Sequence, residues 1–140
     1  MAENLFLKTL NGHKQSKTPI WMMRQAGRYL EEYRQIRATQ TDFISFCLNP
    51  KQASTVTLQT ITRFGFDAAI IFSDILMVPW ALQRNVRFRP NVGPLLDPMQ
   101  SPKAIEQSLI DDLPQELAPV GEALRLTKSK LPTETALIGF

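Results

Sequence analysis

Two arginines and one aspartate are the residues most able to bind and process an anionic substrate. Arg24 and Arg28 flank a Gln-Ala-Gly turn, so the backbone could direct both guanidinium groups at one anion. Each guanidinium can hold a carboxylate through two parallel charge-assisted hydrogen bonds. Gly27 would let the backbone approach a ligand closely. The alternative interpretation is that both arginines form ion pairs with surface acids such as Glu31 and Glu32.

Asp74 is the third candidate, because it follows the apolar run 67–72 by two residues. Ligands of α/β proteins bind outside the carboxyl ends of the strands. A carboxylate among Phe72, Ile75 and Leu76 would be partly desolvated and would need a partner. The alternative is that Asp74 caps the helix that follows.

A helix followed directly by a buried strand is expected to position Asp74. Asn49 suits the N-cap, Pro50 suits the first helical position and Gln52 completes a capping-box pattern, while Gly65 ends the helix. The expected inward face consists of Ala53, Val56, Ile61 and Phe64. The run 67–72 is apolar after its first residue, as in a strand covered on both faces of a parallel sheet. This order of elements is typical of an α/β fold.

Weaker patterns predict the remaining elements. These are a short helix at 5–10, an extended segment at 19–23, a small hairpin from 85–89 and 94–96, a capped helix from Ser101-Pro102 with Ile105 and Leu109 inward, a helix from Pro119 to Leu131 and a second buried strand at 135–140. Two such strands cannot close a barrel, since a (β/α)8 barrel needs about 250 residues. We therefore expect the opening segment of a larger α/β protein.

Composition excludes several classes of protein. The chain has 140 residues, 44% of them hydrophobic, and a net charge of +3. That basic excess is too small and dispersed to favour nucleic acid. The apolar run 68–82 is too short and interrupted for a membrane span. The N-terminus lacks the features of a signal peptide, and a single cysteine cannot form an internal disulfide, so we expect a cytoplasmic protein.

The other residues able to do chemistry have simpler interpretations. His13 has no second histidine or cysteine at metal-ligand spacing, so no metal site is expected. Cys47 is interpreted as a small buried hydrophobe. Arg84, Arg87 and Arg89 are interpreted as a solvated face.

Two sequence blocks closely resemble the uroporphyrinogen decarboxylase family. The first is Pro-Ile-Trp-Met-Met-Arg-Gln-Ala-Gly-Arg-Tyr-Leu at 19–30, continued by Tyr33-Arg34. The second is Phe-Asp-Ala-Ala-Ile-Ile-Phe-Ser-Asp-Ile-Leu at 66–76. Their order and the fifty positions from Arg24 to Asp74 also fit the family, and the resemblance extends through the strand at 136–140.

The resemblance implies a lyase that needs no cofactor or metal and removes the four acetate carboxyl groups of uroporphyrinogen III to give coproporphyrinogen III in tetrapyrrole biosynthesis. It implies a single (β/α)8 barrel, a homodimer, and residues 1–140 as the N-terminal segment of that barrel, truncated after its second strand. It places the catalytic role on Asp74. It places substrate binding on Arg24, Gln25, Ala26, Gly27, Arg28 and Arg37.

These residues suit those roles chemically. An octacarboxylate needs fixed cations, and arginine keeps its charge inside a pocket. The pyrrole, once protonated at carbon, accepts the electrons left by departing carbon dioxide, and a central carboxylate such as Asp74 stabilises the positive charge that develops.

Two departures from the family pattern are expected to matter. Glu31 stands where the family has proline, which we expect to alter a surface turn. A tyrosine, a serine or threonine and a histidine that the family draws from later strands are not among these residues. One alternative is therefore a catalytically inactive fragment or porphyrin-binding remnant. Another is a related barrel that transfers methyl groups with the help of metal-ligating His and Cys residues.

Overall fold

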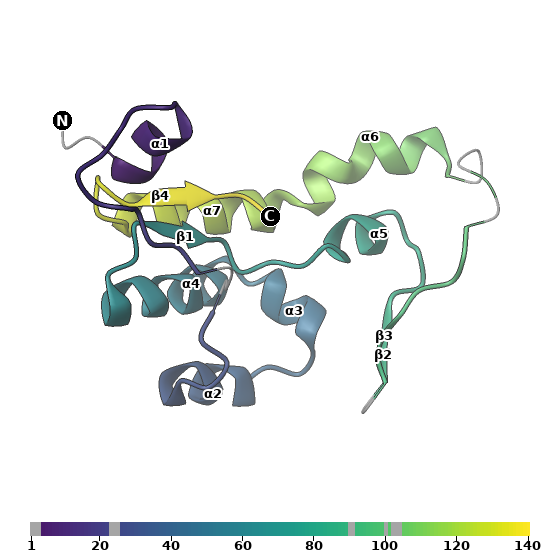
Figure 1. Cartoon of the computed structure of the whole chain (residues 1–140). Coiled ribbons are helices and arrows are strands. Elements are labelled where there is room, and N and C mark those ends of the chain that lie inside the picture. Colours follow the sequence, from purple (N-terminus) through teal and green to yellow (C-terminus); the bar gives the residue numbers. More distant parts are fainter. Residues whose placement is uncertain (1–3, 23–25, 90–91, 100, 102–104) are drawn as a thin grey trace.

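Helices and short strands alternate along the chain (Figure 1). The computed structural model describes residues 4–22, 26–89, 92–99, 101 and 105–140. The helices are α1 (Leu5–Leu10), α2 (Glu31–Ala38), α3 (Phe43–Cys47), α4 (Pro50–Phe64), α5 (Met77–Ala81), α6 (Gln107–Glu116) and α7 (Ala118–Lys130). The strands are β1 (Ala68–Ile70), β2 (Arg87–Arg89), β3 (Gly93–Leu95) and β4 (Ala136–Ile138). The prediction of a mixed α/β fold is confirmed.

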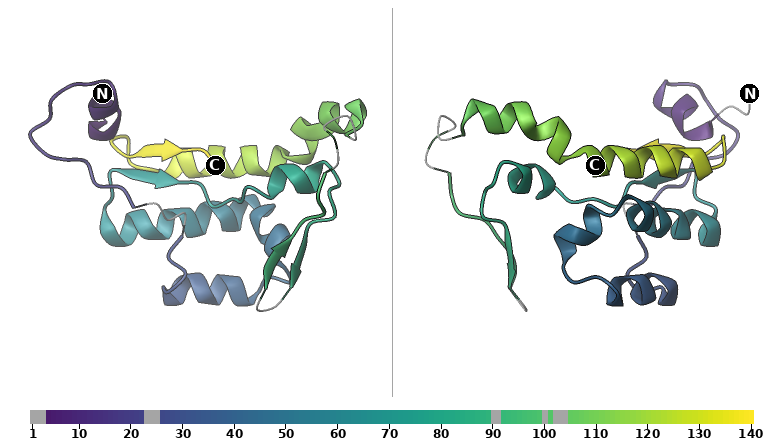
Figure 2. Two further views of the ribbon diagram at one scale, coloured as in Figure 1. Left: turned by 45° about the vertical axis from the view of Figure 1, so that its right-hand side comes forward. Right: turned by 180° about the vertical axis from the view of Figure 1, so that it is seen from behind.

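The two predicted buried strands form a parallel pair, β1 with β4. Ala68 lies opposite Ala136, and the pairing continues past β1, where the Ile71 N–H donates to the Ile138 carbonyl at 3.0 Å. The whole of β1 is buried. Helices α4 and α7 pack against each other and lie together against the strands when the molecule is seen from behind (Figure 2). These two strands are thus parallel neighbours, and the connection between them contains α5, the β2–β3 pair, α6 and α7. Parallel strands connected through helices are typical of the predicted fold class.

Helix α4 has the ends that the sequence predicts. The Asn49 side chain accepts a hydrogen bond from the Gln52 N–H at 3.1 Å, Pro50 is the first residue, and Gly65 ends the helix at φ 63°, where a side chain would be strained. The reciprocal half of the capping box does not form. The Gln52 side-chain oxygen is buried and has no partner among the described residues.

The buried face of α4 differs from the prediction at its end. Ala53 and Val56 are fully buried, but Phe64 is 44% exposed. Phe64 lies in the last turn and stacks on Phe66, with ring centroids 5.4 Å apart, instead of entering the core. Thr57 and Thr60 take buried positions that the apolar pattern did not indicate.

Thr57 ties α4 to the chain that leaves β1. Its hydroxyl donates to the Ala53 carbonyl at 2.7 Å and accepts a hydrogen bond from the Phe72 N–H at 2.8 Å, and Thr57 is fully buried. One hydroxyl therefore satisfies a buried backbone donor that no strand partner reaches.

Two element predictions need correction. The extended residues 19–22 do not form a strand. Two hydrogen bonds nevertheless join this segment to Asp67: the Ile20 N–H donates to Asp67 Oδ2 at 2.6 Å, and the Ile20 carbonyl accepts from the Asp67 N–H at 2.9 Å. Met23 lies outside the described residues. Helix α6 begins at Gln107 rather than at Ser101, because Glu106 is extended (ψ 139°) and provides no side-chain cap. Pro102 also lies outside the described residues.

The other expected elements are present. Helix α1 has the predicted bounds, and α7 buries Ala123 and Thr127. Strands β2 and β3 form the expected antiparallel hairpin, which projects from the body beside α3 (Figures 1 and 2). None of the helices in the described ranges is long and apolar enough to cross a membrane.

We predict that Thr57→Val lowers the free energy of unfolding by about 1–3 kcal/mol, because the buried Phe72 N–H loses its acceptor. Thr127→Val is the matched control. Thr127 is equally buried, and its hydroxyl donates to the Ala123 carbonyl at 2.7 Å without bridging to another described element. Urea unfolding followed by circular dichroism should show a clearly larger loss for Thr57→Val. Equal losses in the two variants would contradict this role of Thr57.

Candidate functional site

Asp74 lies just beyond the carboxyl end of β1, as predicted. Residues 71–73 between them are buried, whereas Asp74 itself is half-buried. Its Oδ1 accepts a hydrogen bond from the Leu76 N–H at 2.9 Å, and its carbonyl accepts one from the Met77 N–H at 3.0 Å. The interpretation of Asp74 as a helix cap is therefore correct only in part. The N-cap of α5 is Leu76, and Asp74 uses one carboxylate oxygen to stabilise the turn that precedes the helix. Oδ2 accepts no hydrogen bond from the described residues.

An aromatic cluster holds the segment that leads to Asp74. The Phe72 ring lies 4.6 Å from that of Phe46, 6.0 Å from that of Phe43 and 6.2 Å from that of Tyr33. The Phe43 ring also contacts Phe88 of the hairpin at 5.3 Å. Because α2 and α3 meet at Phe72, and the hairpin packs on Phe43 of this cluster, the backbone two residues before Asp74 is fixed from several sides.

Cys47 is buried close to Asp74. It is 1% exposed, and burial raises the pKa of its thiol to about 12, with the Asp74 carboxylate as the next cause and Arg37 acting in the opposite direction. A thiol with this pKa is almost entirely protonated at neutral pH and is a poor nucleophile. The interpretation of Cys47 as a small buried hydrophobe is confirmed.

The arginine block is only partly described. Arg24 and Gln25 lie outside the described residues. Ala26 and Gly27 are buried, so they could offer a ligand little more than backbone groups. A Cβ on Gly27 would lie 2.5 Å from the Leu30 side chain, so the close approach that glycine permits here is an internal one. Our expectation of a close approach to a ligand has no support from this geometry.

Arg37 lies near both Tyr33 and Cys47, and Arg28 lies near Tyr33. Both guanidinium groups act to lower the pKa of Tyr33, and Arg37 and Asp74 both influence the pKa of Cys47. Arg28 is exposed, and Arg37 is half-buried with one N–H donating to the Gln40 carbonyl at 3.2 Å. The predicted site residues Arg37 and Asp74 therefore both lie near Cys47, whereas Arg28 lies near Tyr33.

The alternative in which the following glutamates neutralise Arg28 is wrong for the described residues. Glu32 forms its ion pair with Arg63 at 3.0 Å, and Glu31 accepts a hydrogen bond from Gln35 at 3.3 Å. Glu31 is also the first residue of α2 rather than part of a surface turn. An acidic side chain is favourable in the first turn of a helix, where proline is also accepted.

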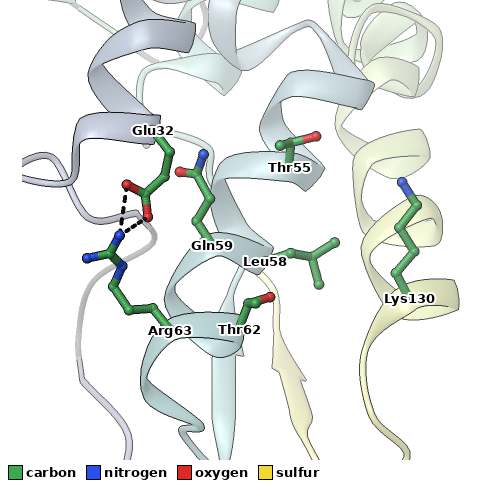
Figure 3. Close-up of a pocket in the computed structure, with 7 residues that line it drawn as sticks. All are labelled: Glu32, Thr55, Leu58, Gln59, Thr62, Arg63 and Lys130. Carbon is green, nitrogen blue, oxygen red and sulfur yellow. Dashed lines mark hydrogen bonds and ion pairs between the residues drawn. The ribbon is translucent and has the colours of Figure 1, made fainter.

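A hollow of about 680 Å³ lies elsewhere (Figure 3). It is lined by Glu32, Thr55, Leu58, Gln59, Thr62, Arg63 and Lys130. Arg63 and Lys130 lie in the last turns of α4 and α7, so this hollow is near the amino ends of β1 and β4. Ligands of α/β proteins bind at the opposite end of the strands. Its volume therefore does not make it the candidate site.

The remaining charged candidates are for the most part exposed. His13 is exposed, and the described residues contain no group of three or more His, Cys, Asp or Glu side chains placed to hold a metal ion. Arg87 pairs with Asp97 at 2.9 Å while more than half exposed, and Arg89 is exposed. Arg84 is half-buried, so the set is not a fully solvated face.

Tyr33 is the member of this neighbourhood that the sequence did not indicate as functional. Its spacing could have indicated a functional role, because Tyr33 precedes Arg37 by four residues and the two share one face of α2. Tyr33 stands in the motif 19–34, but aromatic residues at helical spacing usually belong to a core.

Fold and site together define an α/β protein with a half-buried carboxylate just beyond the carboxyl end of a parallel strand and arginines in the segment 28–37. The model of the uroporphyrinogen decarboxylase (URO-D) family matches residues 1–140. The chain belongs to this family.

Curated relatives match the whole chain. The uroporphyrinogen decarboxylase of Chelativorans sp. (strain BNC1) is 51% identical over 142 residues, and that of Agrobacterium fabrum is 49% identical over 140 residues. These alignments cover 100% of the chain but 41% and 40% of the relatives. The chain therefore spans about two fifths of their length.

One similar solved structure is a methyltransferase from Methanosarcina mazei. It matches with a TM-score of 0.72 over 96% of this chain and 40% of its own, at 17% identity. At this identity the likeness shows a shared fold and carries no information on the reaction.

We predict that Cys47, the single cysteine of the chain, reacts with iodoacetamide at pH 8 at least about a hundredfold more slowly in the native protein than in urea. A pKa near 12 leaves about a thousandfold less thiolate than an unfolded cysteine has. Mass spectrometry of timed samples would give both rates. Similar rates in the two states would show that the thiol is accessible and that its burial is overstated.

Proposed function

We propose that this chain is the N-terminal part of a uroporphyrinogen decarboxylase, a carboxy-lyase that converts uroporphyrinogen III to coproporphyrinogen III. The observation that carries the proposal is the family match over residues 1–140. The charges of Arg37 and Asp74 near Cys47, and of Arg28 and Arg37 near Tyr33, support it. The substrate carries eight carboxylates, so a site with several arginines fits its charge.

The proposed mechanism gives the arginines a binding role. Arg24, Gln25, Arg28 and Arg37 hold carboxylates of the substrate, while Ala26 and Gly27 contribute backbone. Arg37 retains further N–H donors after the hydrogen bond to Gln40, because a guanidinium has five. Arg28 has no ion pair with the described residues that a substrate would have to displace. The side arms of the macrocycle can therefore be fixed before any bond breaks.

Asp74 acts on the centre of the macrocycle. Protonation of a pyrrole carbon makes that ring an electron sink, the bond from the acetate methylene to its carboxyl carbon breaks, and carbon dioxide leaves. The bond electrons neutralise the cationic ring and leave an exocyclic methylene group. A proton from solvent converts this methylene to the methyl group of the product, and loss of the proton from the ring carbon restores the pyrrole. Asp74 accepts hydrogen bonds from the pyrrole N–H groups and stabilises the cation while it exists. Its half-buried position strengthens that interaction, and the Leu76 N–H keeps the carboxylate oriented.

The proposal includes the architecture and setting of the whole enzyme. Residues 1–140 form the N-terminal segment of one (β/α)8 barrel domain, in which β1 and β4 are neighbouring barrel strands. The parallel pairing of these strands and the likeness in fold to a longer protein support this assignment. A homodimer in the cytoplasm, acting without cofactor or metal and without nucleic acid or membrane partners, completes the proposal.

Two other functions can be distinguished from the decarboxylase by experiment. An inactive, porphyrin-binding remnant is the first, because the chain spans about two fifths of its relatives. A barrel that transfers methyl groups is the second. It shares the fold, but the family match favours the decarboxylase.

We predict that Asp74→Asn lowers kcat by about 10²–10³, the loss typical of removing one preorganised electrostatic group. The test uses a hybrid in which these 140 residues replace the matching part of the Chelativorans relative. Uroporphyrinogen III is incubated anaerobically, and the oxidised products are separated by their number of carboxyl groups. Asp97→Asn is the control, because Asp97 is half exposed and pairs with the exposed residues Asn85 and Arg87.

Two results would contradict the proposal. A hybrid that turns over equally well with Asp74→Asn would exclude the assigned role of Asp74. A folded hybrid that removes no carboxyl groups would exclude the decarboxylase and favour the remnant.

We predict that the 140-residue chain alone removes no carboxyl groups beyond a control without protein, because the family draws further site residues from later strands. The same anaerobic assay measures this. Carboxyl loss that Asp74→Asn abolishes would show that the segment carries a sufficient site.

A further inference from the structure

Tyr33 lies where the candidate arginines meet the aromatic cluster. It is 6% exposed, and its ring contacts Phe46 at 6.0 Å and Phe72 edge-on at 6.2 Å. These contacts hold the ring and therefore fix the direction of its hydroxyl. A mobile surface tyrosine would have no such constraint.

Both arginines are neighbours of this hydroxyl. Arg37 follows Tyr33 by four residues on α2, so the two side chains share a face. Arg28 lies in the segment that leads into the helix, and its charge also acts on Tyr33. Burial is the largest influence on Tyr33 and raises its pKa, while the two guanidinium groups act in the opposite direction. The net effect keeps the phenol protonated at neutral pH, so it is a hydrogen-bond donor.

The Tyr33 hydroxyl forms no hydrogen bond with any other residue that the structure describes. Arg28 likewise has no ion pair there, and Arg37 gives one N–H to the Gln40 carbonyl. A fixed phenol and two guanidinium groups therefore present donors that the described protein does not use. A carboxylate has two oxygens with about four acceptor sites and can take several such donors at once.

We propose that the Tyr33 hydroxyl is a third donor to the substrate carboxylate that Arg28 and Arg37 bind. This inference rests on the proposed function and adds a specificity residue to it. A phenol contributes a directional hydrogen bond without further positive charge. It therefore favours a planar carboxylate in one orientation, whereas guanidinium groups alone attract any anion.

The test compares Tyr33→Phe with Tyr29→Phe in the hybrid enzyme. Phenylalanine keeps the ring contacts of Tyr33 and removes only the hydroxyl. Tyr29 is the other tyrosine of the chain and is 66% exposed, so it is the matched control. We expect Tyr33→Phe to raise KM for uroporphyrinogen III about tenfold, as for the loss of one hydrogen bond to a charged group, with kcat changed less than about twofold. We expect Tyr29→Phe to leave both constants unchanged.

The urea concentration at the midpoint of unfolding distinguishes a binding role of the hydroxyl from a purely structural one, and Tyr33→Phe should leave this midpoint unchanged. An unchanged KM would overturn the inference. A raised KM accompanied by a lowered urea midpoint would also overturn it. Binding of oxidised uroporphyrin, an octacarboxylate, is measured in parallel by fluorescence. If the hybrid lacks turnover yet Tyr33→Phe weakens this binding, the decarboxylase proposal fails and the inference stands. Equal binding by both proteins, or no binding by the unsubstituted hybrid, would overturn the inference.

Discussion

The hydrogen bond from the Phe72 N–H to the Thr57 hydroxyl fixes the end of β1 against α4. A backbone donor that leaves a short strand inside a core needs an acceptor, and Thr57 supplies it at no cost in exposed surface. The aromatic cluster around Phe72 then has a fixed centre on which α2, α3 and the hairpin can pack. The position of Asp74, two residues later, follows from this anchor more than from β1 itself, which is three residues long.

Charge is distributed unevenly around that anchor. The buried Cys47 thiol remains protonated beside Asp74, so it adds no second negative charge. Arg28 and Arg37 supply positive charge nearby, and they form no ion pair with Glu31 or Glu32. The result is a partly desolvated region whose unused groups are mostly donors and cations. Such a region attracts a polyanion, and one carboxylate within it can stabilise a cation that develops at the centre of the bound molecule.

The sequence predicted the parts of this arrangement that depend on local chemistry. Asn49, Pro50 and Gly65 specify the ends of α4 through capping and a left-handed residue, and these ends are as predicted. Continuous apolar runs identified both parallel strands. The predicted start of α6 at Ser101 is too early. A Ser-Pro pair is compatible with a helix start but does not require one, and the extended backbone at Glu106 places the start at Gln107.

Tertiary features were harder to predict. The burial of Thr57 depends on the Phe72 N–H, which is fifteen positions away in sequence, so no helical pattern could reveal it. The Gly27 prediction assumed a ligand, whereas the neighbour that needs the space is Leu30. Asp74 was predictable because a strand end has a known geometric meaning in α/β folds.

The two ends of the parallel pair illustrate why charge locates the site better than volume does. Near the amino ends, the hollow of about 680 Å³ contains Glu32 and Arg63, which neutralise each other at 3.0 Å. Just beyond the carboxyl end of β1, one oxygen of the half-buried Asp74 has no such partner among the described residues. A partly buried carboxylate is destabilising unless a hydrogen-bond donor or a cation pairs with it. A ligand that supplies N–H donors, such as the pyrrole groups of the proposed substrate, therefore gains more from Asp74 than from charges that already neutralise each other.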